Sequence, residues 1–273
     1  MLELLFNRTP IWAFGAGAFV VLGLVTEGGF LLQRRLDRRA LAAEAGLAAK
    51  AGGPAQILGV TLGLMSLLLS FTFSIAVNRH DARRVLVLAE ANAIGTAWLE
   101  AGLADEPYRT TLEQTLKTYV QVRVDFYEAG DDEARLAAVE QRTSALQAQL
   151  WATTGQVVRG SPNTEYSAAL MGSMTSLFDQ APARKAAMAA RIPTAVLSTL
   201  SLLLLASAAM LGAVLGEGGG RRHRLLWLVL LAMLAVTMTL IIDIDRPRQH
   251  HVRVSQAPLN DLRLQLIDEA TEP

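Results

Sequence analysis

The sequence contains no cysteine among its 273 residues. It therefore offers no disulfide, no thiolate nucleophile and no thiolate ligand for zinc or an iron–sulfur cluster. It also lacks an excess of either charge, because 25 Lys and Arg residues offset 25 Asp and Glu residues. A nucleic-acid-binding surface normally needs a basic face, so we do not expect a nucleic-acid partner.

Motifs of the common enzyme classes are missing as well. The histidines His80, His223, His250 and His251 do not have the i, i+4 spacing of a zinc-binding helix. We find no glycine-rich phosphate loop, no Gly-x-Ser-x-Gly motif and no paired carboxylates typical of a soluble cleft. We therefore predict no catalytic residue, no metal and no cofactor, and a membrane enzyme is the least favoured reading.

Long apolar stretches are what the sequence does have. Four of them, nearly free of charge and about 18–24 residues long, could each cross a hydrocarbon core of about 30 Å as a helix. Lipid offers no hydrogen-bond partner for a bare backbone group, so helices are the expected form. The sequence predicts an all-α integral membrane protein with spans at about 10–32, 54–77, 192–215 and 225–242.

The only basic residue before the first span is Arg8. The basic residues that follow the span are Arg34, Arg35, Arg38 and Arg39. A cleavable signal peptide has the opposite order, with positive charge before a shorter apolar segment. We interpret the first run as a retained span, and the alternative is a signal peptide that is removed.

Polar to mixed sequence fills 78–191, between the second and third spans, with apolar residues three and four positions apart. This pattern predicts a helical bundle inserted between two transmembrane hairpins, 1–77 and 192–245, with a polar C-terminal tail at 246–273. Pro182 and Pro193 are expected to bend the chain where it returns to the membrane. The predicted helix stripes are Val85, Leu88, Asn92, Thr96, Leu99 and Leu103; Tyr108, Leu112, Leu116, Tyr119, Arg123 and Phe126; Leu136, Val139, Thr143, Leu146, Leu150, Thr154 and Val157; and Tyr166, Leu170, Met174 and Leu177.

The basic residues give a divided prediction of orientation. Those in the two short connections favour a cytoplasmic location for the connections, which places the termini and the 78–191 region outside the cytoplasm. Those flanking the 78–191 region favour the reverse, but the rule gives more weight to short loops. The first group is Arg34, Arg35, Arg38, Arg39, Lys50, Arg221, Arg222 and Arg224, and the second is Arg79, Arg83, Arg84, Arg184, Lys185 and Arg191.

One face of the second span is small and polar, whereas the opposite face is rich in leucine, methionine and phenylalanine. Small residues let helices approach closely, so a packing face is the simpler interpretation. A water-facing pore wall is the other, and the two can coexist in an oligomer. The pore-lining candidates are Gly63, Ser66, Ser70, Ser74 and Asn78.

Charged residues gather after the second span and at the end of the fourth. The first group is expected to form a junction between membrane and bundle or a basic vestibule, with Asn92 buried on its stripe. The second forms an interfacial stop with a local Asp243–Arg246 ion pair, or a charged ring at a pore mouth. The junction or vestibule candidates are Arg79, Asp81, Arg83, Arg84, Glu90 and Asn92, and the span-four candidates are Asp243, Asp245, Arg246 and Arg248.

Three motifs follow one another along the chain: SFTFSIAVNRHDARR at 70–84, EANAIGT at 90–96 and DIDRPR at 243–248. With the four-span pattern, they resemble the bacterial bestrophin-like membrane family over about 58–264. The resemblance implies kinship with bestrophin anion channels, an oligomeric pore and a helical region in the cytoplasm, against the short-loop charges. The signature positions would be Asp81, Arg83, Arg84, Glu90, Asn92, Gly95, Asp243, Asp245, Arg246, Pro247 and Arg248.

Two functions remain open at this point. The first is an oligomeric ion channel, selective for anions, in a bacterial inner membrane; its second span would line the pore, and its partners would be lipid, further copies of itself and inorganic ions. The alternative is a non-conducting sensor or scaffold whose helical region binds a ligand or a partner.

Overall fold

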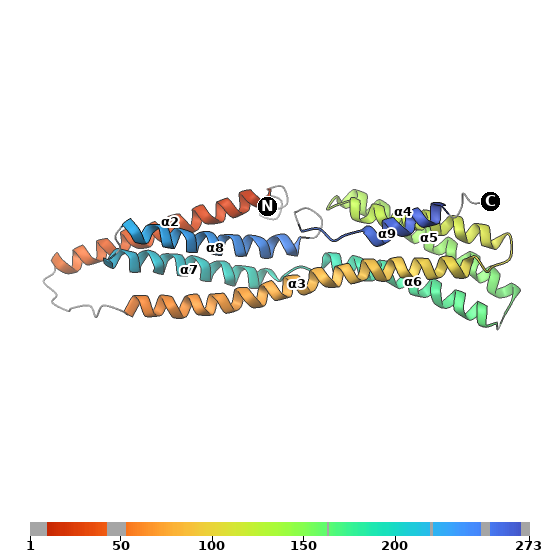
Figure 1. Ribbon diagram of the computed structural model, residues 1–273, viewed down its shortest axis with the longest axis horizontal. Helices are drawn as coiled ribbons and strands as arrows, with labels where there is room; N and C mark the ends of the chain where they lie inside the picture. The colour runs from red at the N-terminus through yellow and green to blue at the C-terminus, as the bar shows by residue number, and fades with distance from the viewer. Residues whose placement is uncertain (1–9, 43–52, 163, 219–220, 247–251, 269–273) are drawn as a thin grey trace. The chain divides into compact units, whose positions relative to one another are not determined.

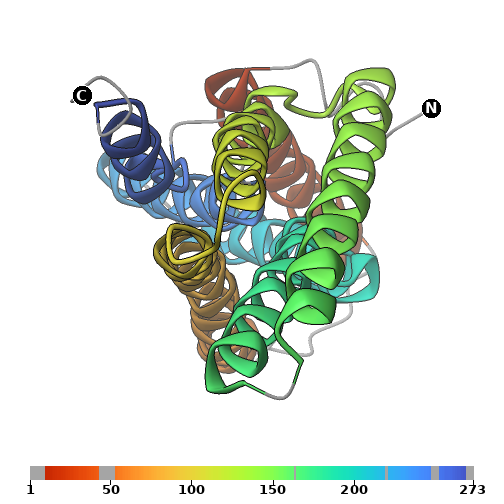
Figure 2. The same ribbon diagram turned by 90° about the vertical axis from the view of Figure 1, so that its right-hand side faces the viewer.

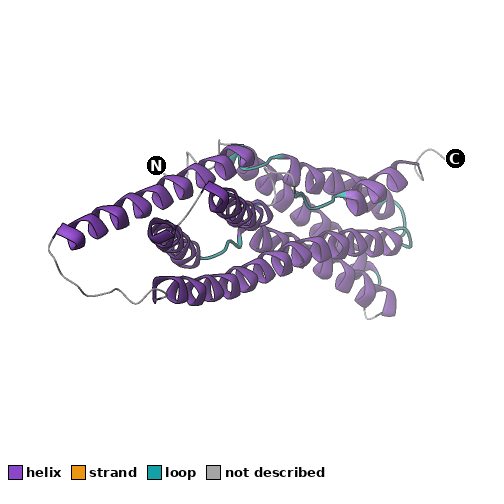
Figure 3. Ribbon diagram, turned by 60° about the vertical axis from the view of Figure 1, so that its left-hand side comes forward, coloured by secondary structure: helices purple, strands orange, loops and turns teal. Residues whose placement is uncertain are grey.

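The computed structural model describes residues 10–42, 53–162, 164–218, 221–246 and 252–268. All regular structure in these ranges is α-helical (Figure 3). The helices are α2 (Ile11–Ala42), α3 (Gly53–Ala101), α4 (Tyr108–Glu128), α5 (Glu133–Gly160), α6 (Glu165–Ala189), α7 (Thr194–Gly218), α8 (Arg221–Asp245) and α9 (Ala257–Asp268). The chain divides into two compact units, unit 1 (1–78 and 191–246) and unit 2 (79–190 and 247–273), and α3 contributes residues to both.

Four stretches of the described residues are long and apolar enough to cross a membrane, judged by length and composition. They are Ile11–Arg39, Ala55–Ala101, Glu165–Gly216 and Leu225–Asp245. The first, second and fourth lie within α2, α3 and α8, and the third extends from α6 into α7. Each overlaps one of the predicted spans. The prediction of an all-helical chain with four long apolar helices is therefore confirmed.

In unit 1, α2 packs along α7 and α8 (Figure 1). A Cβ atom on Gly212 would lie 1.9 Å from the carbonyl oxygen of Thr26, and one on Gly29 would lie 2.2 Å from that of Ala209. Neither separation leaves room for a side chain, so glycine is required at both positions. Small residues bring α2 and α7 into backbone contact, a common basis of helix packing in lipid.

Unit 2 contains α4, α5, α6 and α9, together with the second half of α3 (Figure 2). Three of the predicted stripes, on α4, α5 and α6, face inward as expected. Their fully buried members include Leu112, Leu116, Tyr119, Leu150, Leu170 and Met174.

The predicted stripe on α3 is wrong. Leu99 and Leu103 are 71% and 73% exposed, and Asn92, expected to be buried, is exposed as well. The opposite face of the helix, which includes Val87 and Ile94, enters the core instead. Both faces carry apolar residues at helical spacing, so periodicity identified the helix but not the side that its own chain covers.

The two prolines expected to bend the chain behave differently. Pro182 lies inside α6, which continues to Ala189. Pro193 immediately precedes α7, so the break between the two helices falls at 190–193. Proline is tolerated just before a helix because the first backbone N–H groups have no intrahelical partner.

The region expected to be a polar C-terminal tail contains α9. Its Leu259 and Leu266 are buried in the same core cluster as Leu112 and Tyr119 of α4. Arg263 of α9 also donates a hydrogen bond of 3.0 Å from Nη1 to Oε1 of Gln121. Residues 252–268 are thus an integral part of unit 2.

Candidate functional sites

The pore-lining candidates on α3 are all exposed in the single chain: Gly63, Ser66, Ser70, Ser74 and Asn78. A Cβ atom added to Gly63 would meet nothing within 4 Å among the described residues. Leu64 and Phe71, beside them, are 50% and 60% exposed. The buried side of this segment is formed by Met65, Leu69 and Ala76. The membrane-spanning part of α3 therefore has a broad face that the described residues leave uncovered.

Some hydroxyl groups on this segment donate to carbonyl groups of their own helix. Ser70 Oγ donates to the carbonyl oxygen of Ser66 at 2.9 Å, and Thr72 Oγ1 donates to that of Leu68 at 2.8 Å. Such i−4 hydrogen bonds remove the cost of an unpaired donor in lipid. The serine oxygen still has acceptor capacity, so this face can meet either a helix or water.

Asp245, one of the span-four candidates, links the end of α8 to the residues just before α7 through hydrogen bonds. Its two carboxylate oxygens accept from the backbone N–H of Ile192 at 3.1 and 3.2 Å. Arg191 Nη1 donates to the Asp245 carbonyl oxygen at 2.7 Å. These contacts satisfy backbone groups just before α7, which gives Asp245 a structural role within unit 1.

Asp243 is also buried, and its Oδ1 has no hydrogen-bond partner among the described residues. It lines a largely apolar cavity of about 480 Å³ between α2 and α8 with residues such as Trp12 and Thr239. The backbone N–H of Arg246 donates a hydrogen bond of 3.2 Å to the Asp243 carbonyl oxygen. Arg248, the remaining candidate, lies outside the described residues.

The residues that follow the second span are divided between surface and interior. Asp81 and Arg84 are exposed and lie 3.8 Å apart, whereas Arg79 is half-buried. Arg83 is buried and donates to the carbonyl oxygens of Ala187 at 3.0 Å and Ala190 at 2.8 Å. A cation is favourable at a helix C-terminus, where carbonyl groups lack intrahelical partners. Arg83 is thus held within unit 2 and is not exposed to solvent.

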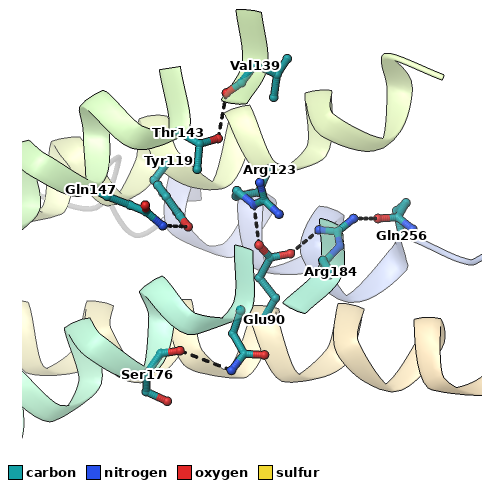
Figure 4. A network of polar contacts seen from close by, with 10 residues as sticks. Glu90, Tyr119, Arg123, Val139, Thr143, Gln147, Ser176, Arg184 and Gln256 are labelled. Atoms are coloured by element: carbon teal, nitrogen blue, oxygen red, sulfur yellow. Dashed lines mark hydrogen bonds and ion pairs between the residues drawn. The ribbon is translucent and has the colours of Figure 1, made fainter. Parts of the chain in front are cut away.

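Glu90 forms the centre of a buried ionic cluster in unit 2, which Figure 4 shows from close by. Its carboxylate accepts from Arg123 Nε of α4 at 2.5 Å and from Arg184 Nη1 of α6. The exposed fractions of these three side chains are 0%, 2% and 1%. Two guanidinium groups thus share one carboxylate, and the cluster carries one positive charge that Glu90 does not neutralise.

One neutral side chain extends the cluster, and a separate neutral pair lies beside it (Figure 4). Arg184 Nη2 donates to Gln256 Oε1 at 2.8 Å, and Gln147 Nε2 donates to the Tyr119 hydroxyl at 3.2 Å. Burial, the largest cause, raises the pKa of Tyr119 to about 12, so its hydroxyl stays protonated at neutral pH. These contacts therefore connect α3, α4, α5, α6 and the segment before α9.

Sequence reasoning placed Glu90 at the junction and Arg123 on a helix stripe, but it did not bring them together, and it used Arg184 only in the orientation argument. A charged residue on an otherwise apolar stripe, such as Arg123, was the available signal. Charged side chains are almost never fully buried unless they are paired. Charged residues of opposite sign on the apolar stripes of separate helices would therefore predict such a cluster.

The apolar helices and the arrangement of their charged ends define a multi-pass helical membrane protein. The family model of the bestrophin-like domain matches residues 19–259, and the chain belongs to this family. The resemblance predicted from the three motifs is confirmed.

Solved structures of a bacterial bestrophin homologue from Klebsiella pneumoniae share the fold. One single-substitution variant matches with a TM-score of 0.70 at 13% identity. The match covers 96% of this chain and 98% of the variant's chain. Another has a TM-score of 0.69 at 14% identity and covers 92% and 98%. No curated protein sequence matches the chain.

Proposed function

We propose that the protein is an oligomeric ion channel of a bacterial inner membrane, lined by the membrane-spanning part of α3. The observation that carries this proposal is the uncovered face of that segment, with Gly63, Ser66, Ser70 and Ser74 exposed in the single chain. Lipid is a poor environment for a serine-rich face compared with a second helix or a water-filled path. Symmetric association of several copies around this face would give it neighbouring helices to pack against and a water-filled path along the axis.

Kinship with bestrophin anion channels supports the choice of anions. The exposed or half-buried charged residues beyond the span are Arg79, Asp81 and Arg84, which together carry one excess positive charge. Repeated around an axis, this excess would raise the local concentration of anions at one mouth of the pore. Arg83 and Glu90 are left out of this group because both are buried.

The apolar residues beside the serines suit a constriction. Leu64 and Phe71, separated by seven residues, lie two helical turns apart on one side of α3, and Leu67 lies between them. All three are at least half exposed in the single chain. A ring of such side chains can close a pore to ions by excluding water.

Planar-bilayer recording of the purified protein tests the proposal. Single-channel steps are expected, and Ser70→Leu should change their amplitude because it adds a bulky apolar group to the lining face. Ser201→Leu on α7 is the matched control, since Ser201 is also exposed and donates to a carbonyl of its own helix at 2.8 Å. An intact oligomer that conducts none of the tested ions at any voltage would refute the channel.

A non-conducting sensor or scaffold is the second candidate function, favoured by a cavity in unit 2 beside the ionic cluster. Recovery of one stoichiometric partner with the purified protein, together with the absence of ion flux, would support it over the channel.

A further inference from the structure

Unit 2 contains a cavity of about 290 Å³ between α4, α5 and α6. Its size is near the lower end of the range for small-molecule sites in proteins. Part of its rim is open to solvent, because Ser144, Pro182 and Lys185 are exposed. Its lining residues include Arg123 and Phe126 of α4, Thr143, Ser144 and Gln147 of α5, and Phe178 of α6.

Arg123 gives this cavity an unused hydrogen-bond donor. Its Nε is bound to Glu90, but its buried Nη2 has no hydrogen-bond partner within the part of the chain that the structure describes. A buried donor without an acceptor costs about 1–3 kcal/mol, and more when the group is charged. Arg123 also lines the cavity, so its guanidinium group lies close to any acceptor that is bound there.

The charged groups in and beside the cavity have a net charge of one positive unit. Arg123 and Arg184 share Glu90, while Lys185 is paired with Glu140 at the rim, with 2.7 Å between Nζ and Oε2. Arg123, Lys185 and Glu140 line the cavity, whereas Glu90 and Arg184 are paired beside it, and together these five groups carry one excess positive charge. A single negative charge neutralises the group, whereas a dianion would bring excess charge close to Glu90 and Glu140.

The remaining lining favours an organic anion over a bare ion. The Phe126 ring lies under the guanidinium groups of Arg123 and Arg184, at 4.8 and 5.6 Å from its centroid. Phe178 is held edge-to-face by Trp151 at 6.2 Å, and Ala181 and Pro182 complete the apolar part. Fixed aromatic and aliphatic surfaces beside one cationic donor suit a molecule with an anionic end and an apolar body.

We propose that this cavity binds a small organic monocarboxylate. Its carboxylate accepts from Arg123 Nη2, with the Ser144 hydroxyl and Lys185 Nζ as further donors at the rim, and its apolar body lies against Phe126 and Phe178. The site lies within unit 2 and does not depend on conduction. Binding to a protein that fails to conduct would refute the channel alone.

Isothermal titration calorimetry of the full-length protein in detergent, with empty micelles as a blank, tests the site. Sodium benzoate is the probe, and benzamide, its neutral analogue, and sodium chloride at equal ionic strength are the controls. Saturable binding of benzoate with at least tenfold weaker binding of benzamide is expected. Absence of benzoate binding, or equal binding of benzamide, would overturn the proposal.

Two substitutions locate the binding. Ser144→Leu fills the rim from an exposed helical position, and Gln147→Glu places a carboxylate of the chain itself in the cavity; each is expected to weaken benzoate binding at least tenfold. Gln149→Leu is the matched control, because Gln149 is exposed on the same helix but does not line the cavity. Unchanged affinity in both cavity variants, with far-ultraviolet circular dichroism confirming their fold, would assign the binding elsewhere and refute the site.

Discussion

The two faces of α3 in unit 2 have similar apolar content but opposite surroundings. Val87 and Ile94 are fully buried in the core of the unit, whereas Val85 and Leu88 are 64% and 51% exposed. The buried face also carries Glu90, the residue that composition alone would assign to solvent. Burial on this helix is therefore decided by the partners that the chain supplies, two arginines above all, and not by hydrophobicity alone.

The glycines of unit 1 show the same contrast. Glycine is required at positions 212 and 29 because the backbone of a neighbouring helix occupies the space of a side chain. Gly59 and Gly63 of α3 have no such neighbour within 4 Å among the described residues. Packing within the chain explains the glycines of α2 and α7 but not those of α3. Unexplained small residues of this kind are expected on a helix that packs against another copy in an oligomer.

Removing the charge of Glu90 should have the largest effect. Glu90→Gln leaves two buried guanidinium groups without a counter-charge, which costs about 3–5 kcal/mol of stability. Unfolding in mixed micelles, followed by circular dichroism, measures the loss. Asp81→Asn on the exposed face is the control, because its exposed pair with Arg84 contributes under about 0.5 kcal/mol. Equal stability of the two variants would contradict the cluster.

Gly212→Val should have the next largest effect. The new side chain would overlap the Thr26 carbonyl, so α2 and α7 must separate at a cost of about 1–3 kcal/mol or more. The same unfolding measurement applies. Gly63→Val is the matched control in α3 and should leave the stability of the single chain unchanged while altering assembly. A comparable loss of single-chain stability in both variants would show that α3 is also packed tightly within the chain.

Much of the fold followed from apolar spacing. The four spans and the stripes on α4 to α6 were predictable because each of these elements has one apolar face or is apolar throughout. The α3 stripe failed because that helix has apolar residues on two faces, and spacing does not say which one the chain itself covers. The helix α9 was missed because a short amphipathic segment after a long polar stretch gives a weak signal.

The charged sites were predictable only as positions. Asp245 and Glu90 were both identified as candidates, yet their partners come from residues 53 and 94 positions away in the sequence, Ile192 and Arg184. Contacts of this kind depend on helix register in three dimensions. Sequence spacing along one helix does not contain that information.

The exposed stripe of α3 in unit 2 should affect assembly with little effect on folding. Leu99→Glu is expected to change the stability of the single chain by less than about 0.5 kcal/mol, since it alters an exposed position. If copies associate along this face, the oligomer should dissociate, as measured by light scattering after size-exclusion chromatography. Leu264→Glu on α9, also exposed, is the control and should leave the oligomer intact. An unchanged oligomer in Leu99→Glu would exclude this stripe from the interface.

The smallest perturbation compares the C-terminal end of α2 with the turn between α4 and α5. Because the sequence has no cysteine, Arg38→Cys and Asp131→Cys each introduce a single reactive thiol at an exposed position. Only the second predicted span lies between positions 38 and 131, so the two thiols should lie on opposite sides of the membrane. From the family resemblance, we expect a membrane-impermeant maleimide to label Arg38→Cys in intact spheroplasts and Asp131→Cys only after permeabilisation. The reverse result would show that the short-loop arginines set the orientation, and labelling of both before permeabilisation would contradict the second span.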